Sequence, residues 1–366
     1  MRMSRYSLAL AAVLCAGAAP AQQNELSEDS SFLRVTIGGK SVRLEAFAVK
    51  RADATGKLPI ALIAHGKPTT QGSMLDQRAT DYARQARDLA RRGWLAVAVM
   101  RRGFGASDGP APVPLSCAST TLVDRFNADA DDLEAALETI GKRPDADPLR
   151  VIAIGVSAGG AAVTALSARN PKGLVGAVNI SGGLRFPSCP KEDALVAAFK
   201  AYGAKSRVPS LWVYAKNDSF FGPAVVERMQ AAFLDGGGDV KLVMLEADER
   251  ADGHFIFGLA SGRFKWLPQM DAFLRFHKLP TWTRDDVNVL MRKLNAKEPS
   301  RAFLENYVAG PTERALARQK AGTFLTETHG SRSLEDARKA ALESCEKRGQ
   351  PCEILMENDR WRGPAE

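Results

Sequence analysis

Two apolar patterns alternate along the chain between about residues 32 and 278. Amphipathic stretches with helical spacing separate short continuous apolar runs, which are typical of buried strands. The apolar runs lie at 59–64, 94–100, 150–154, 174–180, 210–215 and 240–245. The amphipathic stretches lie at about 74–92, 124–141, 158–169, 190–203, 222–236 and 264–277. Two earlier runs, 32–37 and 42–49, flank Gly38-Gly39 and predict an antiparallel hairpin. We therefore expect an α/β fold with an eight-stranded, mostly parallel sheet and helices on both faces.

The alternation stops after Pro280, and a smaller unit is expected behind it. A charged helical stretch continues to about residue 308, and 313–319 has the pattern of a strand. Ser333 has the form of a helix N-cap with Asp336 at the third helical position, and Gly349 suits the end of that helix. A last short strand is expected at 352–357. This gives four segments: 1–21, a large domain at 22–282, a helical linker at 283–311 and a small α+β module at 312–366.

The first 21 residues have the form of a cleavable signal peptide. Arg2 and Arg5 precede a short apolar stretch, and Ala19-Pro20-Ala21 provides small residues before a cut after about Ala21. The expected location is therefore periplasmic or secreted. Removal of the two arginines lowers the formal net charge from +8 to +6.

Composition narrows the function classes further. The chain has 366 residues, of which 45% are hydrophobic and 25% charged, as in ordinary globular proteins. The basic residues are spread out, so no nucleic-acid partner is expected. No apolar stretch approaches the roughly 20 residues of a membrane-spanning helix, so no membrane span is expected. The composition leaves the oligomeric state open.

Loss of Cys15 with the signal peptide leaves an even number of cysteines: Cys117, Cys189, Cys345 and Cys352. Four cysteines in an exported protein predict two disulfides, with three possible connectivities. We expect Cys345–Cys352, which are close in sequence, and Cys117–Cys189, which both lie in loop-like stretches. No histidine accompanies either pair, so no metal site is expected.

Two segments match the G-x-S-x-G pattern of a nucleophile elbow, so the pattern alone does not identify the nucleophile. Ser157 follows a buried strand and precedes a helix rich in small residues, which is the context that an elbow requires. Ser107 is followed by Pro110, Pro112 and Pro114, which cannot continue a helix. We therefore expect Ser157 to be the nucleophile and Ser107 to belong to a turn.

The general base is sought among only four histidines. His254 follows the last strand of the large domain, where the order Ser…Asp…His places the base. His65 ends a strand and suits a loop that shapes the site, His277 lies in a helix, and His329 lies in the small module. Asp218 follows the strand 210–215 and can reach His254 from a neighbouring strand end. Asp248, Glu249 and Asp252 are closer in sequence but poorly placed to orient the imidazole.

Acyl transfer also needs donors for the developing oxyanion. An elbow provides the backbone N–H of Ala158. The loop after the strand 59–64 provides a second, and Lys67 is the candidate because Pro68 has no N–H.

These residues together resemble the α/β-hydrolase superfamily, in particular its exported dienelactone-hydrolase-like or serine esterase branch. The resemblance rests on His65-Gly66, the segment 102–109, the elbow around Ser157, Asp218 and His254, and covers about residues 32–278. It implies a Ser-His-Asp hydrolase acting on a small-molecule acyl substrate, preferably a carboxylic ester, without metal or organic cofactor. Dienelactone hydrolases have cysteine where this chain has Ser157, which favours ester or peptide-like substrates.

Two alternatives remain open. The same triad serves acyltransferases and peptidases, and a hydrolase scaffold can also act as a non-catalytic binding protein. An epoxide hydrolase or dehalogenase is disfavoured, because aspartate would be expected at position 157 in those enzymes.

The interval 181–208 leaves room only for a small lid, so a fairly open site is expected. Phe186, Phe199, Phe220 and Phe255 are candidates for the wall of the site, and a core position is the equal alternative for each of them.

Overall fold

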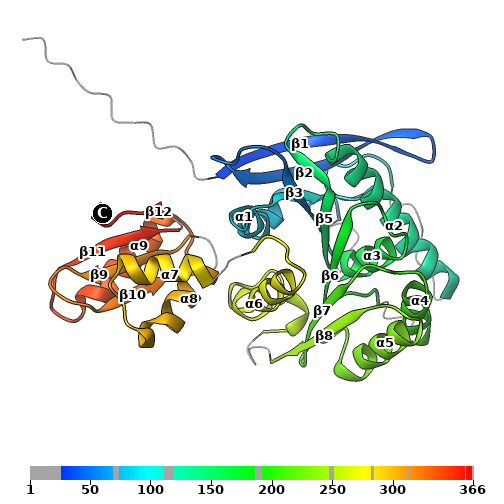
Figure 1. The fold of residues 1–366 in the computed structure, drawn as a ribbon. Helices are drawn as coiled ribbons and strands as arrows, with labels where there is room; N and C mark the ends of the chain where they lie inside the picture. Colours follow the sequence, from blue (N-terminus) through cyan, green and yellow to red (C-terminus); the bar gives the residue numbers. More distant parts are fainter. Residues whose placement is uncertain are drawn as a thin grey trace, which may run out of the picture.

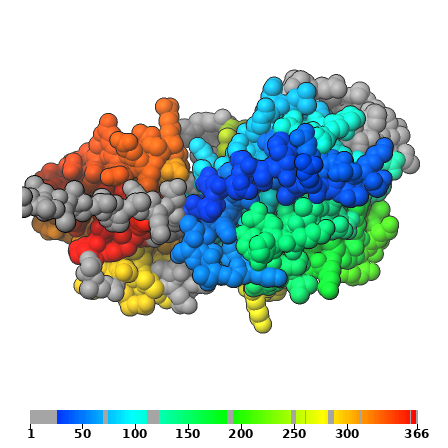
Figure 2. Space-filling model, turned by 90° about the horizontal axis from the view of Figure 1, so that it is seen from above, coloured from blue at the N-terminus to red at the C-terminus, as the bar shows by residue number. Residues whose placement is uncertain are grey.

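The computed structural model describes residues 26–68, 74–110, 119–185, 192–246, 251–281, 284–310, 313–358 and 360–364. It contains a large α/β unit and a smaller C-terminal unit, which lie side by side in Figures 1 and 2. The expected signal peptide at 1–21, Cys117 and Cys189 lie outside the described residues.

An eight-stranded sheet forms the centre of the large unit, as the sequence predicted. The order in the sheet is β1-β2-β4-β3-β5-β6-β7-β8. β1 and β2 form an antiparallel hairpin, β2 also pairs antiparallel with β4, and the other neighbours are parallel. The strands are β1 Leu26–Ile37, β2 Lys40–Arg51, β3 Leu58–Ala64, β4 Leu95–Val99, β5 Ala146–Val156, β6 Leu174–Ile180, β7 Ser210–Ala215 and β8 Val240–Leu245. The hairpin forms one edge of the sheet, and its blue surface is exposed in Figure 2.

Helices cover both faces of this sheet (Figure 1). One face packs on α1 (Ala83–Arg91) and α6 (Ala260–Phe276), and the other on α2 (Ser119–Ile140), α3 (Ala158–Ser167), α4 (Asp193–Gly203) and α5 (Pro223–Asp235). Side chains of β3 alternate between the two buried clusters, Ile60 and Leu62 on one side and Ala61 and Ile63 on the other. A parallel strand buried on both faces therefore has a continuous apolar sequence.

The interval in which a small lid was expected contains a helix of the regular fold. α4 is the crossover helix between β6 and β7, and its residues Ala198 and Phe199 belong to the core. The interval 181–208 is thus largely used for the regular fold. The space left for a lid is the short connection between β6 and α4, whose residues 186–191 lie outside the described part.

The C-terminal unit is built on a four-stranded antiparallel sheet of order β10-β9-β11-β12. Its strands are β9 Ala315–Gln319, β10 Leu325–Thr328, β11 Cys352–Glu357 and β12 Arg360–Trp361, and α9 is Leu334–Glu346. β9, α9 and β11 match the sequence expectation, whereas β10 and β12 were not predicted. Both are too short to show a periodic pattern.

The charged helical stretch is two helices, α7 (Arg284–Lys293) and α8 (Arg301–Ala309), and not one. Leu290 of α7 and Leu304 of α8 share a buried cluster with Leu316 and Leu355 of the sheet. The segment expected as a linker therefore belongs to the core of the C-terminal unit. Its helices were recognised from charge, but their buried faces are set by the sheet on which they pack.

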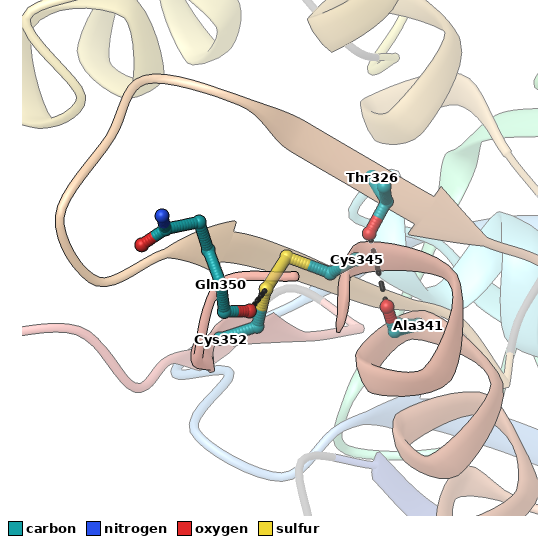
Figure 3. The surroundings of a disulfide bond; sticks show 5 residues. All are labelled: Thr326, Ala341, Cys345, Gln350 and Cys352. Atoms are coloured by element: carbon teal, nitrogen blue, oxygen red, sulfur yellow. Dashed lines mark hydrogen bonds between the residues drawn. A yellow bond between two sulfur atoms is a disulfide. The ribbon is translucent and has the colours of Figure 1, made fainter. Parts of the chain in front are cut away.

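A disulfide joins Cys345 at the end of α9 to Cys352 at the start of β11, the pair that was expected from its spacing (Figure 3). Thr326 of β10 also donates a hydrogen bond to the carbonyl of Ala341 in α9 at 3.0 Å. These two links hold the helix against the small sheet, which has a thin core of its own. Within the described ranges no helix is both long enough and apolar enough to cross a bilayer.

Candidate active site

The turn between β5 and α3 presents Ser157 with a strained backbone. Ser157 has φ 54° and ψ −123°, a conformation that L-residues rarely adopt. Two glycines permit it: a Cβ on Gly155 would lie 2.1 Å from the carbonyl oxygen of Gly159, and a Cβ on Gly159 would lie 2.3 Å from that of Ala64. The close crossing of strand and helix is therefore possible only without side chains at these positions, as expected for an elbow.

A chain of hydrogen bonds runs from Ser157 through His254 to Asp218. Ser157 Oγ lies 3.1 Å from His254 Nε2, and His254 Nδ1 lies 3.1 and 3.2 Å from the two carboxylate oxygens of Asp218. Ser157 directly follows β5, and Asp218 and His254 lie in the loops after β7 and β8. Because these strands are parallel, their carboxyl ends lie at the same end of the sheet. The structure thus brings together all three residues singled out in the sequence, and His254 and Asp218 are both buried.

The loop after β7 fixes the carboxylate of Asp218. Its Oδ1 accepts hydrogen bonds from the backbone N–H groups of Phe220 and Phe221 at 2.8 and 2.9 Å. These bonds leave the carboxylate pointed at Nδ1 of His254. Nδ1 is therefore the nitrogen that carries the proton, and Nε2 is free to accept the proton of Ser157.

Asp252 is only two residues from His254, but unlike Asp218 it does not bond to the imidazole ring. It accepts the backbone N–H of His254 at 2.9 Å, and the N–H and hydroxyl of Ser219 at 3.1 and 2.5 Å. Burial opposes ionisation, but these hydrogen bonds outweigh it and lower the pKa of Asp252. The carboxylate joins the loops that carry Asp218 and His254. Asp248 and Glu249 lie outside the described residues.

Aromatic rings enclose the imidazole of His254. Phe220 stacks on it with ring centroids 4.2 Å apart and an interplanar angle of 28°. Phe221 and Phe255 meet it at 5.7 and 5.5 Å. Phe220 and Phe255 were expected on the wall of the site, but the stacking of Phe220 on the histidine and the edge-on contact of Phe255 depend on loop conformation and left no signal in the sequence.

His65 shapes the loop after β3. The ring is fully buried; Nε2 accepts the backbone N–H of Arg101 at 2.9 Å and Nδ1 donates to the carbonyl of Gly66 at 2.7 Å. Burial and the nearby cation of Arg101 hold the pKa of His65 well below its usual value of 6.5, so the ring is neutral. A Cβ on Gly66 would lie 3.3 Å from Cβ of Ser157, which places this loop directly against the serine.

The two candidate oxyanion donors are the backbone N–H groups of Ala158, next to Ser157, and of Lys67, in the loop after β3. The N–H of Ala158 is the first of α3, and the first N–H groups of a helix have no intrahelical partner. Lys67 follows Gly66 in the loop that lies against Ser157. The N–H of Gly66 itself donates to the hydroxyl of Tyr82 at 3.2 Å. Burial and the cation of Arg125 lower the pKa of the Lys67 ammonium.

A cavity of about 690 Å³ opens in front of Ser157 and His254. Ordinary small-molecule sites have about this size. Aromatic and aliphatic side chains dominate its wall: Tyr82, Val156, Leu184, Phe220, Phe221, Phe255, Phe257 and Leu259. Of the two positions open to Phe199, the structure shows the core and not the cavity wall, because its ring is fully buried against Trp212. Phe186 lies outside the described residues.

The second serine motif lies away from the cavity. Ser107 is buried in a turn, where its hydroxyl donates to the carbonyl of Met100 at 2.8 Å and accepts the N–H of Glu45 at 2.9 Å. His277 packs beside Phe273 at the end of α6, and His329 pairs with Glu327 in the C-terminal unit. The described residues contain no cluster of three or more His, Cys, Asp or Glu side chains placed to hold a metal ion.

Comparison with known proteins finds the same fold. The family model described as "Serine aminopeptidase, S33" matches residues 75–230, and no curated protein matches the chain. Among solved structures, dipeptidyl peptidase 4 of Porphyromonas gingivalis is similar with a TM-score of 0.50 and 20% identity, over 67% of this chain and 35% of that one.

Two smaller structures superpose less well. The acetyl xylan esterase of Paenibacillus sp. R4 has a TM-score of 0.49 and 14% identity, over 71% of this chain and 86% of that one. A candidate dienelactone hydrolase of Klebsiella pneumoniae has a TM-score of 0.46 and 19% identity, over 66% of this chain and 98% of that one. At such identities structural likeness bears on the fold alone.

Proposed function

The chain is an α/β-hydrolase by fold, and from this premise we propose that it is a serine hydrolase that cleaves a carboxylic ester through an acyl-enzyme. The observation that carries the proposal is the hydrogen-bonded chain Ser157–His254–Asp218 at the wall of a cavity of about 690 Å³. A buried aspartate, an oriented histidine and a serine on a strained turn are the parts that nucleophilic acyl transfer requires.

In the first step, His254 Nε2 takes the proton of Ser157 Oγ as the hydroxyl oxygen attacks the ester carbonyl. The negative charge moves to the carbonyl oxygen, and the N–H groups of Ala158 and Lys67 stabilise it by hydrogen bonds. Asp218 stabilises the imidazolium that forms. His254 then gives its proton to the leaving alcohol, and the acyl group remains on Ser157.

In the second step, a water molecule hydrolyses the acyl-enzyme. His254 takes a proton from the water, the hydroxide attacks the acyl carbonyl, and Ser157 recovers its proton as the acid leaves. If an alcohol or amine enters instead of water, the same steps give an acyl transfer, and an amide substrate makes the protein a peptidase. The aromatic and aliphatic cavity wall suits an ester with apolar groups better than a peptide chain.

The test uses a fluorophosphonate probe followed by product analysis. The mature chain should be labelled at Ser157, should hydrolyse 4-nitrophenyl esters, and should release free acid. If the probe labels Ser157 but no ester or amide is cleaved and no acyl group is transferred to another acceptor, the protein would be a binding protein and not an enzyme. Faster cleavage of matched anilides than of esters would make it a peptidase.

The proposed location is outside the cytoplasm. The segment 1–21 has the pattern of a signal peptide, and a Cys345–Cys352 disulfide suits an oxidising compartment. N-terminal sequencing of the protein exported by a bacterial host tests this, with Gln22 as the expected first residue.

A further inference from the structure

Resting on the proposed hydrolase activity, we propose that the substrate is an ester that carries an aromatic ring with a neutral hydrogen-bond donor, such as a phenolic hydroxyl. The cavity wall has two chemically different parts. One is aromatic and lies around His254. The other is formed by residues before and within α1 and contains hydrogen-bond acceptors without partners.

The aromatic part comes from the loops after β7 and β8. Phe220, Phe221, Phe255 and Phe257 all line the cavity, and Tyr82 joins them from the turn before α1. Phe255 is 52% exposed although it lies beside His254, so much of its ring is free to contact a ligand. Aromatic rings prefer offset-stacked or edge-to-face neighbours, and a flat aromatic group satisfies this preference in a cavity of about 690 Å³.

The acceptors are the side-chain oxygens of Gln77 and Gln85. Both residues line the cavity, and in both the buried Oε1 has no hydrogen-bond partner within the described structure. Gln85 is 3% exposed, and its Nε2 donates to the carbonyl of Phe257 at 2.9 Å. The amide is therefore oriented, and Oε1 is the atom left to meet a donor from a ligand. A buried acceptor without a partner is costly, so a bound donor would recover that cost.

The charges around the cavity favour a neutral donor over an ammonium group. Lys67 and Arg185 line the cavity as cations, and Arg185 is held there by the carbonyls of Ser219 and Phe220 at 3.2 and 3.3 Å. Asp81 is the acidic residue of the described lining, and its carboxylate accepts the backbone N–H of Arg78 at 2.8 Å. A hydroxyl can donate to glutamine oxygens without repulsion from the two cations.

The experiment measures kcat/KM for two matched series of esters. One series varies the acyl part, 3-phenylpropanoate against 3-(4-hydroxyphenyl)propanoate with the same alcohol. The other varies the alcohol part, 2-phenylethyl against 2-(4-hydroxyphenyl)ethyl with the same acid. Because an unpaired buried acceptor gains a partner, we expect the hydroxylated ester to be preferred roughly tenfold in one of the two series.

Gln77→Met and Gln85→Met, which keep the length of the side chain, should reduce this preference to less than about threefold. Gln77→Met is the cleaner variant, because Gln85→Met also removes the bond to Phe257. Gln230→Met, on α5, is the matched control and should keep the full preference. Thermal melting establishes that each variant is folded.

The outcomes separate this inference from the proposed function. No hydrolysis of any ester, 4-nitrophenyl acetate included, would overturn the proposed function. Ester hydrolysis with equal kcat/KM for hydroxylated and plain rings in both series would overturn this inference alone. A tenfold preference that survives in both glutamine variants would also overturn it, because other groups would then bind the hydroxyl.

Discussion

The two G-x-S-x-G segments of this chain have the same pattern and opposite surroundings. At 155–159 the pattern joins β5 to α3, and the hydroxyl of Ser157 faces an imidazole and a cavity. At 105–109 it lies in a turn after β4, and both hydrogen-bonding directions of Ser107 Oγ are used by backbone groups. A serine becomes a candidate nucleophile only when the fold leaves its hydroxyl unused and supplies a base.

The last glycines of the two segments, Gly159 and Gly109, differ in their surroundings, whereas the first glycines, Gly155 and Gly105, are both crowded by backbone atoms. Gly155 and Gly159 are needed because backbone atoms of neighbouring elements lie where a Cβ would be. A Cβ on Gly109 would meet nothing within 4 Å, and the φ of +81° is the reason that glycine is favoured there. Close packing thus requires glycine at the elbow, and a turn conformation requires it at Gly109.

The largest expected effect comes from removing the two hydroxyls. Ser157→Ala should lower kcat/KM for a 4-nitrophenyl ester by about 10⁴-fold or more, because the nucleophile is lost. Ser107→Ala should leave kcat/KM within about threefold of the wild type but lower the free energy of unfolding by about 1–2 kcal/mol, because two backbone groups lose a buried partner. Steady-state kinetics and urea denaturation measure both. Similar losses of activity in the two variants would contradict the distinction.

Replacing the last glycine of each segment by alanine should lower the free energy of unfolding by different amounts. In Gly159→Ala, the new methyl group would lie 2.3 Å from the carbonyl oxygen of Ala64, so we expect a loss of about 3 kcal/mol or more. Gly109→Ala should cost about 1 kcal/mol, the strain of a positive φ alone. Urea denaturation at pH 7.5 compares the two variants, and equal losses would show that the elbow is no tighter than the turn.

His65 connects the two segments, and its titration tests that connection. Its ring packs on Phe104, the residue before the second segment, with centroids 4.4 Å apart, and a Cβ on the next residue, Gly66, would lie 3.3 Å from Cβ of Ser157. Because the folded pKa of His65 lies well below 6.5, the unfolded chain binds the proton more tightly. The stabilisation is present above pH 6.5 and is lost as the pH falls towards the folded pKa. The slope for one proton is about 1.4 kcal/mol per pH unit.

Replacement of the histidine should remove that slope. His65→Asn should be less stable than the wild type at pH 7.5, but should lose less additional stability between pH 6.5 and pH 5. His277→Asn, at the end of α6, is the control for the loss of a histidine that has no contact with either segment. Denaturant titrations at four pH values provide the comparison. An unchanged slope in His65→Asn would mean that other groups dominate acid unfolding.

The smallest expected effect concerns the residue after each serine. Ala158 is expected to supply its N–H to an oxyanion, whereas Asp108 pairs with Arg43 at the surface at 2.9 Å. Asp108→Asn should leave kcat/KM unchanged and lower the melting temperature slightly at low salt, because salt screens exposed ion pairs. A melting curve at 1 M NaCl should show no difference. A change in kcat/KM would indicate that the turn at 105–109 influences the site.

Much of the large unit could be predicted from the sequence. Its central parallel strands contain continuous apolar runs, because burial on both faces of a parallel sheet disfavours polar side chains. The proline run after Ser107 separated the two serine segments, since proline cannot continue a helix. The order Ser157…Asp218…His254 selected three residues that the structure brings within hydrogen-bond distance.

The remaining features depend on side chains meeting across long sequence separations. The unpaired oxygens of Gln77 and Gln85, the stacking of Phe220 on His254 and the joining role of Asp252 have no sequence pattern of their own. The same holds for α7 and α8, whose apolar residues are buried because β9 and β11 lie beside them. Periodicity reports which face of an element is apolar, but not which element will cover it.

Within the large unit, the sequence by itself therefore determined the order of strands and helices, the elbow at Ser157 and the identity of its two partners, because these follow from apolar patterns and from the order of residues along the chain. The tertiary structure alone decided that Phe199 lies in the core while Phe220 lies in the cavity, and that the cavity combines aromatic walls with unpaired acceptors. Burial and hydrogen-bond satisfaction depend on neighbours that are distant in sequence, and only the folded chain specifies them.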